Sequence, residues 1–239
     1  MNPLENKSSI EEIRVRFDND VERFSNLETG QISTLDANFS LELITESARR
    51  MNPKAKTLLD VGCGAGNYTL KMLGKIPNLE CTLVDLSQAM ISRAVERISP
   101  HTSKKVKAIK SDIREANLAH NCFDIVLAGA VLHHLRDDED WKNVFEKLYA
   151  ILKPGGCLMI CDMVVQNDEI VTKYVWELYG QYLENLKDKE YREKVLAYVE
   201  KEDSPRSIIY QLELIKEVGF TKVDILHKNL NFAVIMGIK

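Results

Sequence analysis

Residues 57–69 read Thr-Leu-Leu-Asp-Val-Gly-Cys-Gly-Ala-Gly-Asn-Tyr-Thr, and this stretch decides the fold. Its first five residues are mainly apolar, with a carboxylate at Asp60, and predict a short buried strand. Three glycines follow at alternate positions from Gly62 to Gly66 and form a loop that lets a ligand approach the backbone closely. The residues from Asn67 onward predict a helix, so the loop amides lie at a helix N-terminus. We therefore expect the nucleotide-binding first turn of a doubly wound α/β domain.

The spacing of the glycines distinguishes this loop from two common phosphate-binding motifs. A dinucleotide fingerprint, Gly-x-Gly-x-x-Gly, needs its third glycine where this chain has Asn67. A P-loop needs Gly-Lys-Ser/Thr after the loop, and no lysine stands there. A nicotinamide-dependent oxidoreductase is therefore a disfavoured alternative.

The composition fits one α/β domain with an insertion, since the chain has 239 residues of which 45% are hydrophobic. A net charge of −4 argues against a surface that neutralises many phosphates, so no nucleic-acid partner is expected. The N-terminus does not resemble a signal peptide, and no apolar run approaches the ~20 residues of a membrane span. We expect a soluble, cytoplasmic protein without a membrane partner.

The five cysteines are scattered and include no Cys-x-x-Cys pair. This pattern predicts buried thiols in a reducing compartment rather than disulfides or zinc ligands. The sequence therefore predicts no metal site.

Two further predicted strands are followed by carboxylates. The strand Glu80–Asp85 ends in an acid one helix and a turn after Asp60, which is consistent with a βαβ unit. Asp85 is suited to accept hydrogen bonds from both ribose hydroxyls of an adenosyl group. Behind the strand Val106–Lys110, Asp112 could accept a hydrogen bond from an amino group of a ligand, and the apolar Ile113 could cover a flat ring such as adenine. A turn or helix-cap role is the alternative for both acids.

With these acids in place, residues 60–66 resemble the first motif, Asp-x-Gly-x-Gly-x-Gly, of class I S-adenosylmethionine-dependent methyltransferases. Residues 85–90, Asp-Leu-Ser-Gln-Ala-Met, and 152–156, Leu-Lys-Pro-Gly-Gly, also resemble that family. The resemblance spans Thr57 to the C-terminus and implies S-adenosylmethionine as the cofactor. The expected cofactor-binding residues are Asp60, Gly62, Cys63, Gly64, Asp85, Leu86, Met90, Asp112, Ile113, Ala128 and Gly129.

The same resemblance implies a Rossmann-like, seven-stranded sheet in the order 3-2-1-4-5-7-6, with the last strand antiparallel and helices on both faces. The remaining strands are expected at Phe123–Ala128, Cys157–Val164, Thr221–His227 and Leu230–Ile238. We divide the chain into an N-terminal helical cap (1–52), a cofactor-binding core (53–165), a helical lid insertion (166–205) and a C-terminal helix and hairpin that complete the core (206–239).

Two regions outside the minimal fold are expected to border the substrate. Ser8 and Ser9 stand three residues before Glu11 and Glu12, which is the spacing of a capping box. The apolar stripe from Ile10 to Phe24 that follows predicts one helix. A second amphipathic segment covers Thr34 to Met51. The lid insertion carries aromatic residues that either grip a substrate or pack its helices together, namely Tyr174, Trp176, Tyr179 and Tyr182.

His133 and His134 follow the fourth strand and have the chemistry of general bases. His-His-Leu at this place recurs in methyltransferases of diverse chemistry, so a structural role at a helix start is favoured. No catalytic residue is assigned, because a sulfonium is already activated and in-line positioning supplies most of the catalysis. The predicted reaction is methyl transfer to a small-molecule acceptor, and a homodimer is compatible with the sequence.

One subgroup, carboxy-S-adenosylmethionine synthase of the tRNA wobble-uridine pathway, is similar at residues 112–115 and at Asn231-Phe232. That family places an arginine at the position of Leu214 to hold the extra carboxylate of its cofactor. A leucine side chain has neither a positive charge nor a hydrogen-bond donor with which to bind an anion. This function, or a related tRNA modification, is the alternative, and a cofactor-binding protein without turnover also stays open.

Overall fold

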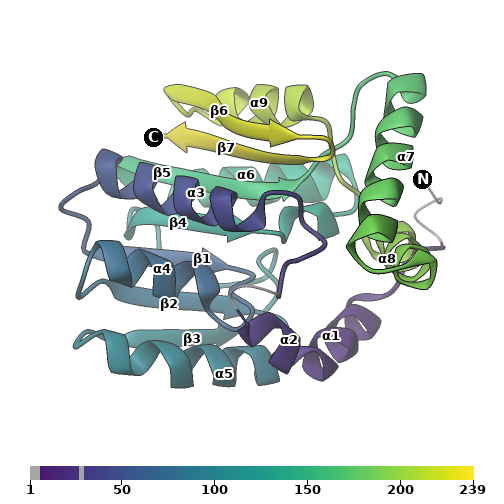
Figure 1. Ribbon diagram of the computed structural model, residues 1–239. Coiled ribbons are helices and arrows are strands. Elements are labelled where there is room, and N and C mark those ends of the chain that lie inside the picture. Colours follow the sequence, from purple (N-terminus) through teal and green to yellow (C-terminus); the bar gives the residue numbers. More distant parts are fainter. Residues whose placement is uncertain (1–5, 27–29) are drawn as a thin grey trace.

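A seven-stranded sheet runs through the centre of the computed structural model, which describes residues 6–26 and 30–239 (Figure 1). The strand order β3-β2-β1-β4-β5-β7-β6 confirms the prediction. All neighbours pair in parallel except β7, which is antiparallel to β5 and β6. The strands are β1 (Thr57–Val61), β2 (Glu80–Asp85), β3 (Val106–Lys110), β4 (Phe123–Gly129), β5 (Leu152–Met163), β6 (Lys222–Asn229) and β7 (Phe232–Ile238).

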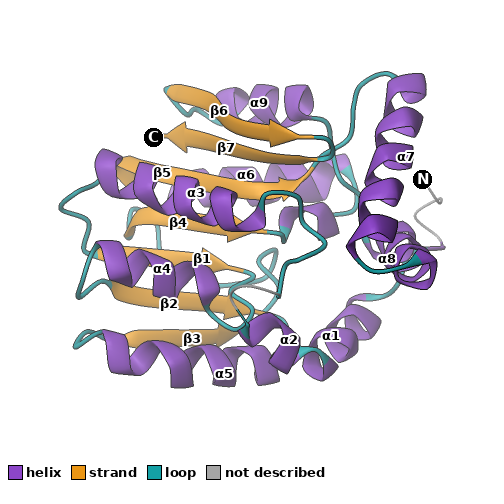
Figure 2. Cartoon of the chain, viewed as in Figure 1, coloured by secondary structure: helices purple, strands orange, loops and turns teal. Residues whose placement is uncertain are grey.

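Helices cover both faces of this sheet, as Figure 2 shows. On one face pack α3 (Ala37–Met51), α4 (Asn67–Lys75) and α5 (Gln88–Ile98), and on the other α6 (Asp138–Ile151) and α9 (Ile208–Glu217). Beyond the carboxyl ends of the parallel strands lie α1 (Ile10–Asn19), α2 (Val21–Ser25), α7 (Glu169–Leu186) and α8 (Lys189–Glu202) (Figure 1). Two short 3₁₀ helices, η2 (Ser99–His101) and η3 (Leu132–His134), complete the described elements.

The central strands are apolar on both sides because each side faces a helical layer. In β1, Leu58 packs toward α3 and α4, whereas Leu59 and Val61 pack into the core that includes α6. All three side chains are fully buried. Alternating residues of a strand point to opposite faces, so a short continuous apolar run is what a doubly covered strand needs.

The predicted helix from Ile10 to Phe24 is wrong in one respect, because the structure breaks it into α1 and α2 at Asp20. The backbone of Asp20 leaves the helical region, with φ −107° and ψ 10°, and its amide donates to the carbonyl of Phe17 at 3.1 Å. That tighter turn ends α1 and redirects the chain. The capping box of Ser9 and Glu12 is confirmed.

The fifth strand also begins earlier than predicted. Helix α6 ends at Ile151, and Leu152 already pairs with Phe123 of β4, so residues 152–156 belong to the strand. Lys153 donates to the Asp124 carboxylate at 3.0 Å, which holds this irregular start against β4.

The insertion is helical as predicted and forms α7 and α8, and a third apolar cluster joins these helices to the ends of β5 and β7. Tyr179 and Leu183 of α7 pack against Val199 of α8 and Phe232 of β7. Tyr179 is therefore buried, whereas Tyr174 on the same helix is 58% exposed. The predicted aromatic group does not share one face.

All five cysteines are free, and four are buried as predicted, while Cys122 is partly exposed. Within residues 6–26 and 30–239, no helix combines the length and apolar character needed to cross a membrane.

Candidate active site

A cleft with about 930 Å³ of empty space, partly open to solvent, lies at the carboxyl ends of β1, β2 and β4. In doubly wound sheets this edge is where ligands bind. The floor of the cleft is the loop after β1, and Phe17 and Phe24 from α1 and α2 cover it. The two phenylalanine rings lie 5.6 Å apart, so the N-terminal segment supplies an aromatic roof.

The glycine loop leaves open space at one position in particular. Gly62 and Gly64 both have positive φ, of 62° and 49°. A Cβ at Gly62 would lie 2.5 Å from a methyl of Val131, so this glycine permits internal packing. A Cβ at Gly64 would meet no protein atom within 4 Å. The backbone at Gly64 is thus exposed to the cleft and fits a ligand pressed against it.

Asp85, at the end of β2, binds this loop. One oxygen accepts from the Gly64 amide at 2.8 Å and the other accepts from the Ser87 amide at 2.9 Å. Burial raises the pKa of Asp85, and the two amide hydrogen bonds oppose that shift. Each carboxylate oxygen keeps a second lone pair for a ligand hydroxyl.

Asp112, at the end of β3, has a partner that the sequence did not indicate. Arg114 bonds to both oxygens of its carboxylate, at 2.6 and 3.0 Å, and also to Asp140 at 2.7 Å. Burial raises the pKa of Asp112, but the hydrogen bonds and charge of Arg114 outweigh it and lower the pKa overall. Asp112 is therefore an ionised acceptor at the cleft wall.

Two of the predicted cofactor residues, Asp60 and Ala128, do not line the cleft. Ala128 is fully buried within β4. Asp60 lies beneath the glycine loop, where Thr69 donates to it at 2.6 Å, and burial raises its pKa to about 7. The structure brings together around the cleft the other predicted residues, which are Gly62, Cys63, Gly64, Asp85, Leu86, Met90, Asp112, Ile113 and Gly129.

A second cavity, with about 620 Å³ of empty space, adjoins the first. Phe17, Phe24, Ala130 and His134 line both cavities, so the two share a wall. Helices α7 and α8 contribute side chains to its lining, as do the strands β5 and β7. The residues that line only this cavity include Met163, Tyr179, Tyr198, Val199, Asp203 and Phe232.

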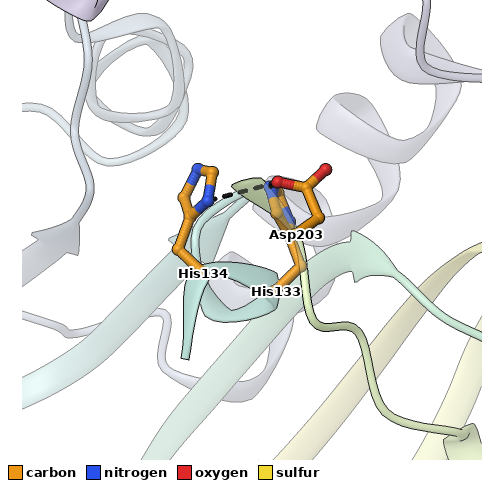
Figure 3. Close-up of side chains that lie close together, drawn as sticks. All are labelled: His133, His134 and Asp203. Carbon is orange, nitrogen blue, oxygen red and sulfur yellow. Dashed lines mark ion pairs between the residues drawn. The ribbon is translucent and has the colours of Figure 1, made fainter. Parts of the chain in front are cut away.

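His133, His134 and Asp203 meet on the wall of the second cavity (Figure 3). Asp203 Oδ1 lies 3.2 Å from Nδ1 of His134 and 3.6 Å from Nε2 of His133. The other ring nitrogen of His133, Nδ1, bonds to the buried carboxylate of Asp162. Burial alone lowers the pKa of His133, but the charges of Asp162 and Asp203 outweigh it and raise the pKa to about 9.

The loop that carries Asp203 is held in place by the N-terminal segment. Arg16 of α1 forms a two-pronged ion pair with Glu202, at 2.5 and 2.7 Å. The Lys7 ammonium donates to the Asp203 carbonyl at 2.5 Å, and Arg136 donates to the Glu202 carbonyl at 2.6 Å. Asp203 lies far from the histidines in sequence and follows no recognisable motif, so only the fold identifies it.

The order of strands and the loop after β1 define a Rossmann-like fold of the kind that binds an adenosyl cofactor. A model of a methyltransferase domain matches residues 58–156. The chain is 31% identical over 185 residues to carboxy-S-adenosyl-L-methionine synthase of Chromohalobacter salexigens, covering 75% of this chain and 67% of that one. It is 26% identical over 215 residues to the synthase of Shewanella loihica, covering 88% and 84%.

Solved structures share the fold. A putative O-methyltransferase from Nostoc punctiforme has a TM-score of 0.67 at 16% identity, over 93% of this chain and 60% of that one. Human N-acetylserotonin methyltransferase in complex with S-adenosylmethionine has a TM-score of 0.62 at 16% identity, over 100% and 60%. The chain thus spans about 60% of the length of these two structures. It belongs to the class I S-adenosylmethionine-dependent methyltransferases, and S-adenosylmethionine is its cofactor.

Proposed function

We propose that the cleft holds S-adenosylmethionine and that the enzyme transfers its methyl group to a small molecule bound in the second cavity. The observation that carries this proposal is the wall shared by the two cavities at Phe17, Ala130 and His134. A cofactor in the cleft and an acceptor in the second cavity would contact the same side chains and therefore lie next to each other. Holding the two reactants in line is the main catalytic contribution that such a transfer needs.

In this proposal each predicted residue at the cleft has a role. Asp85 accepts the ribose hydroxyls, and Asp112 accepts the adenine amino group. Leu86, Met90 and Ile113 supply apolar contacts to the adenine ring. The backbone at Gly62, Cys63, Gly64 and Gly129 lies beside the methionine part. Asp60 acts indirectly, since it supports the loop from below through Thr69.

The second cavity suits a compact, partly aromatic or apolar acceptor. Its lining combines aromatic side chains with charged and ionisable ones. The aromatic residues are Phe17, Phe24, Tyr179, Tyr198 and Phe232, and the charged or ionisable ones are Arg16, Arg23, His133, His134 and Asp203. Aromatic walls exclude water from the sulfonium and from the incoming nucleophile. The net charge of −4 gives the chain no excess of positive charge to neutralise phosphates, which favours a small molecule over a nucleic acid.

A carboxy-S-adenosylmethionine synthase activity is the second candidate, and the identity to the two curated relatives favours it. The position that resembles the carboxylate-binding arginine argues against it. Leu214 lies on the buried face of α9, within the apolar core, and lines neither of the two cavities described above. Methyl transfer is therefore the preferred function.

We also propose that the enzyme works in the cytoplasm. We further propose that it forms a homodimer, and light scattering would measure this oligomeric state directly. We also propose the division of the chain into an N-terminal cap, a cofactor-binding core, a helical lid and a C-terminal helix and hairpin that complete the core. In support of it, the third apolar cluster joins the lid to the core at the ends of β5 and β7.

Native mass spectrometry of the purified chain tests both candidate functions. Retention of S-adenosylmethionine or S-adenosylhomocysteine supports methyl transfer. A species heavier by a carboxyl group supports the second candidate. In calorimetry, S-adenosylmethionine and S-adenosylhomocysteine should each bind with a micromolar dissociation constant, which is a binding free energy of roughly −8 kcal/mol. NAD is the control and should give no heat of binding. Heat with NAD alone would end the proposal.

A further inference from the structure

We propose that His133, His134 and Asp203 form a binding site for one divalent transition-metal ion on the wall of the second cavity. The site follows from side chains that the fold brings together from two distant segments (Figure 3). It does not depend on the methyl-transfer proposal, and a metal is not required to explain the cofactor cleft.

The spacing of the three ligand atoms fits such an ion. One ligand atom from each of His133, His134 and Asp203 lies within 4.8 Å of the other two. The two edges at Asp203 are 3.2 Å to His134 Nδ1 and 3.6 Å to His133 Nε2. An ion with bonds of about 2.1 Å needs ligand edges of about 3.0–3.5 Å, so the two edges at Asp203 already match or nearly match that range.

The Asp162 carboxylate orients the imidazole of His133, one of the three proposed metal ligands. Asp162, fully buried at the end of β5, bonds to Nδ1 of His133, which leaves Nε2 directed at Asp203. Asp162 is itself held by backbone amides, from Leu132 at 2.6 Å and from Met163 at 2.7 Å. Metal-binding histidines almost always have a partner of this kind on the second nitrogen, because it fixes the tautomer and the ring plane.

The burial of the Asp203 carboxylate also supports a metal site. Its side chain is 4% exposed, and its ion-pair partners in the described part of the chain are these two histidines. The 3.2 Å distance to His134 is that of a hydrogen bond, whereas the 3.6 Å distance to His133 is longer than one. A buried carboxylate is stabilised by pairing or by coordination to a metal, and here one ligand atom of each of the three side chains lies within 4.8 Å of the other two.

The ligand set selects the class of ion. Two imidazoles and one carboxylate bind Fe²⁺, Co²⁺ or Zn²⁺, whereas Ca²⁺ and Mg²⁺ prefer sites made of oxygen. Three protein ligands leave coordination positions for a further group, and the adjoining space is the second cavity. If the proposed function holds, the acceptor offers an oxygen or sulfur donor to the ion.

The test uses the full-length chain after dialysis against a chelator. Co²⁺ is titrated in while the visible spectrum is recorded, and Zn²⁺ is then added to displace it. We expect one equivalent of Co²⁺ to bind, with d–d bands and without the intense near-ultraviolet band of cobalt–thiolate ligation. Absence of a bound equivalent for Co²⁺ and for Zn²⁺ would overturn the site and leave a metal-free ion-pair network.

Four variants localise the ion. Asp203→Asn and His134→Gln, which preserve side-chain size, should each weaken binding by roughly 100-fold or more, and Asp162→Asn by about 10- to 100-fold. His227→Gln is the matched control, since His227 also contacts a carboxylate, that of Asp36 at 2.9 Å, but lines neither cavity. Binding that is equal in Asp203→Asn, His134→Gln and wild type would refute the assignment, with circular dichroism confirming that each variant is folded.

Calorimetry with S-adenosylmethionine, run on the metal-free and metal-loaded chain, separates this inference from the proposed function. Cofactor binding without any metal binding overturns the metal site only. Metal binding without cofactor binding supports the site and overturns the proposed function.

Discussion

The Gly64 amide donates to the Asp85 carboxylate at 2.8 Å, and this bond connects the loop after β1 to the end of β2. The two predicted motifs of the cofactor cleft are therefore one hydrogen-bonded unit. A change at Asp85 acts on a bound ligand directly and also on the loop against which the ligand lies.

Asp85→Ala should weaken binding of S-adenosylmethionine by ~1.5–3 kcal/mol, the scale for losing hydrogen bonds to a charged group. It should also lower the free energy of unfolding by about 1–2 kcal/mol, because the Gly64 and Ser87 amides lose their acceptor. Calorimetry and urea unfolding measure the two effects. Unchanged affinity would mean that Asp85 is a loop-fixing residue only.

Gly64→Val should abolish cofactor binding, because its side chain occupies space that meets no protein atom within 4 Å and is kept for the ligand. The smaller Gly64→Ala should also weaken binding, and its positive φ should cost about 1 kcal/mol of stability. Gly74→Ala is the matched control, since a Cβ there is equally free of contacts but lies in helix α4. Normal binding by Gly64→Val would show that the ligand lies elsewhere.

Asp60→Asn should change how stability depends on pH. The Asp60 pKa is raised to about 7 in the folded chain and lies near 3.9 in the unfolded chain. Between these values the unfolded state releases the proton first, so the wild type loses stability as pH rises from about 4 to about 7. The variant lacks this loss, so its stability relative to wild type should rise by on the order of 2 kcal/mol between pH 5 and pH 8. Urea unfolding at the two pH values gives this difference, and a constant difference would contradict it.

Hydrogen exchange tests the lid. Backbone amides of residues 166–205 should be less protected than the central strands in the free enzyme and gain protection when cofactor and acceptor bind. Exchange as slow as in the sheet, with or without ligand, would make the segment a rigid wall.

The hydroxyl of Tyr179 donates to the Ser33 carbonyl at 2.9 Å and joins α7 to the segment before α3. Tyr179→Phe should speed exchange on both sides of this contact and leave affinity for S-adenosylmethionine within about 0.5 kcal/mol. Tyr174→Phe, on the exposed side of the same helix, is the control and should change neither. Tyr179→Ala is less informative, since a cavity at this buried position costs about 3–5 kcal/mol. Equal exchange in Tyr179→Phe and Tyr174→Phe would show that the hydrogen bond does not hold the lid.

The strands and the glycine loop could be predicted from the sequence because their determinants are local. A buried parallel strand needs a continuous apolar run, which residues 57–61 and 123–128 supply. A loop with positive φ needs glycine at defined positions, as at Gly62 and Gly64. The ends of elements were less well predicted. The break at Asp20 and the early start of β5 depend on contacts with other elements, which local pattern does not contain.

Only the tertiary structure decided which side chains meet. Asp112 and Asp85 look alike as acids at strand ends, yet Arg114 neutralises the first while backbone amides bind the second. Asp60 belongs to the motif but lies under the loop, because alternate strand residues point away from the cleft. Asp203 reaches His133 and His134 only because α8 folds back over the carboxyl edge of the sheet. Sequence spacing determines periodicity and turns, whereas a contact between distant segments depends on how the whole chain packs.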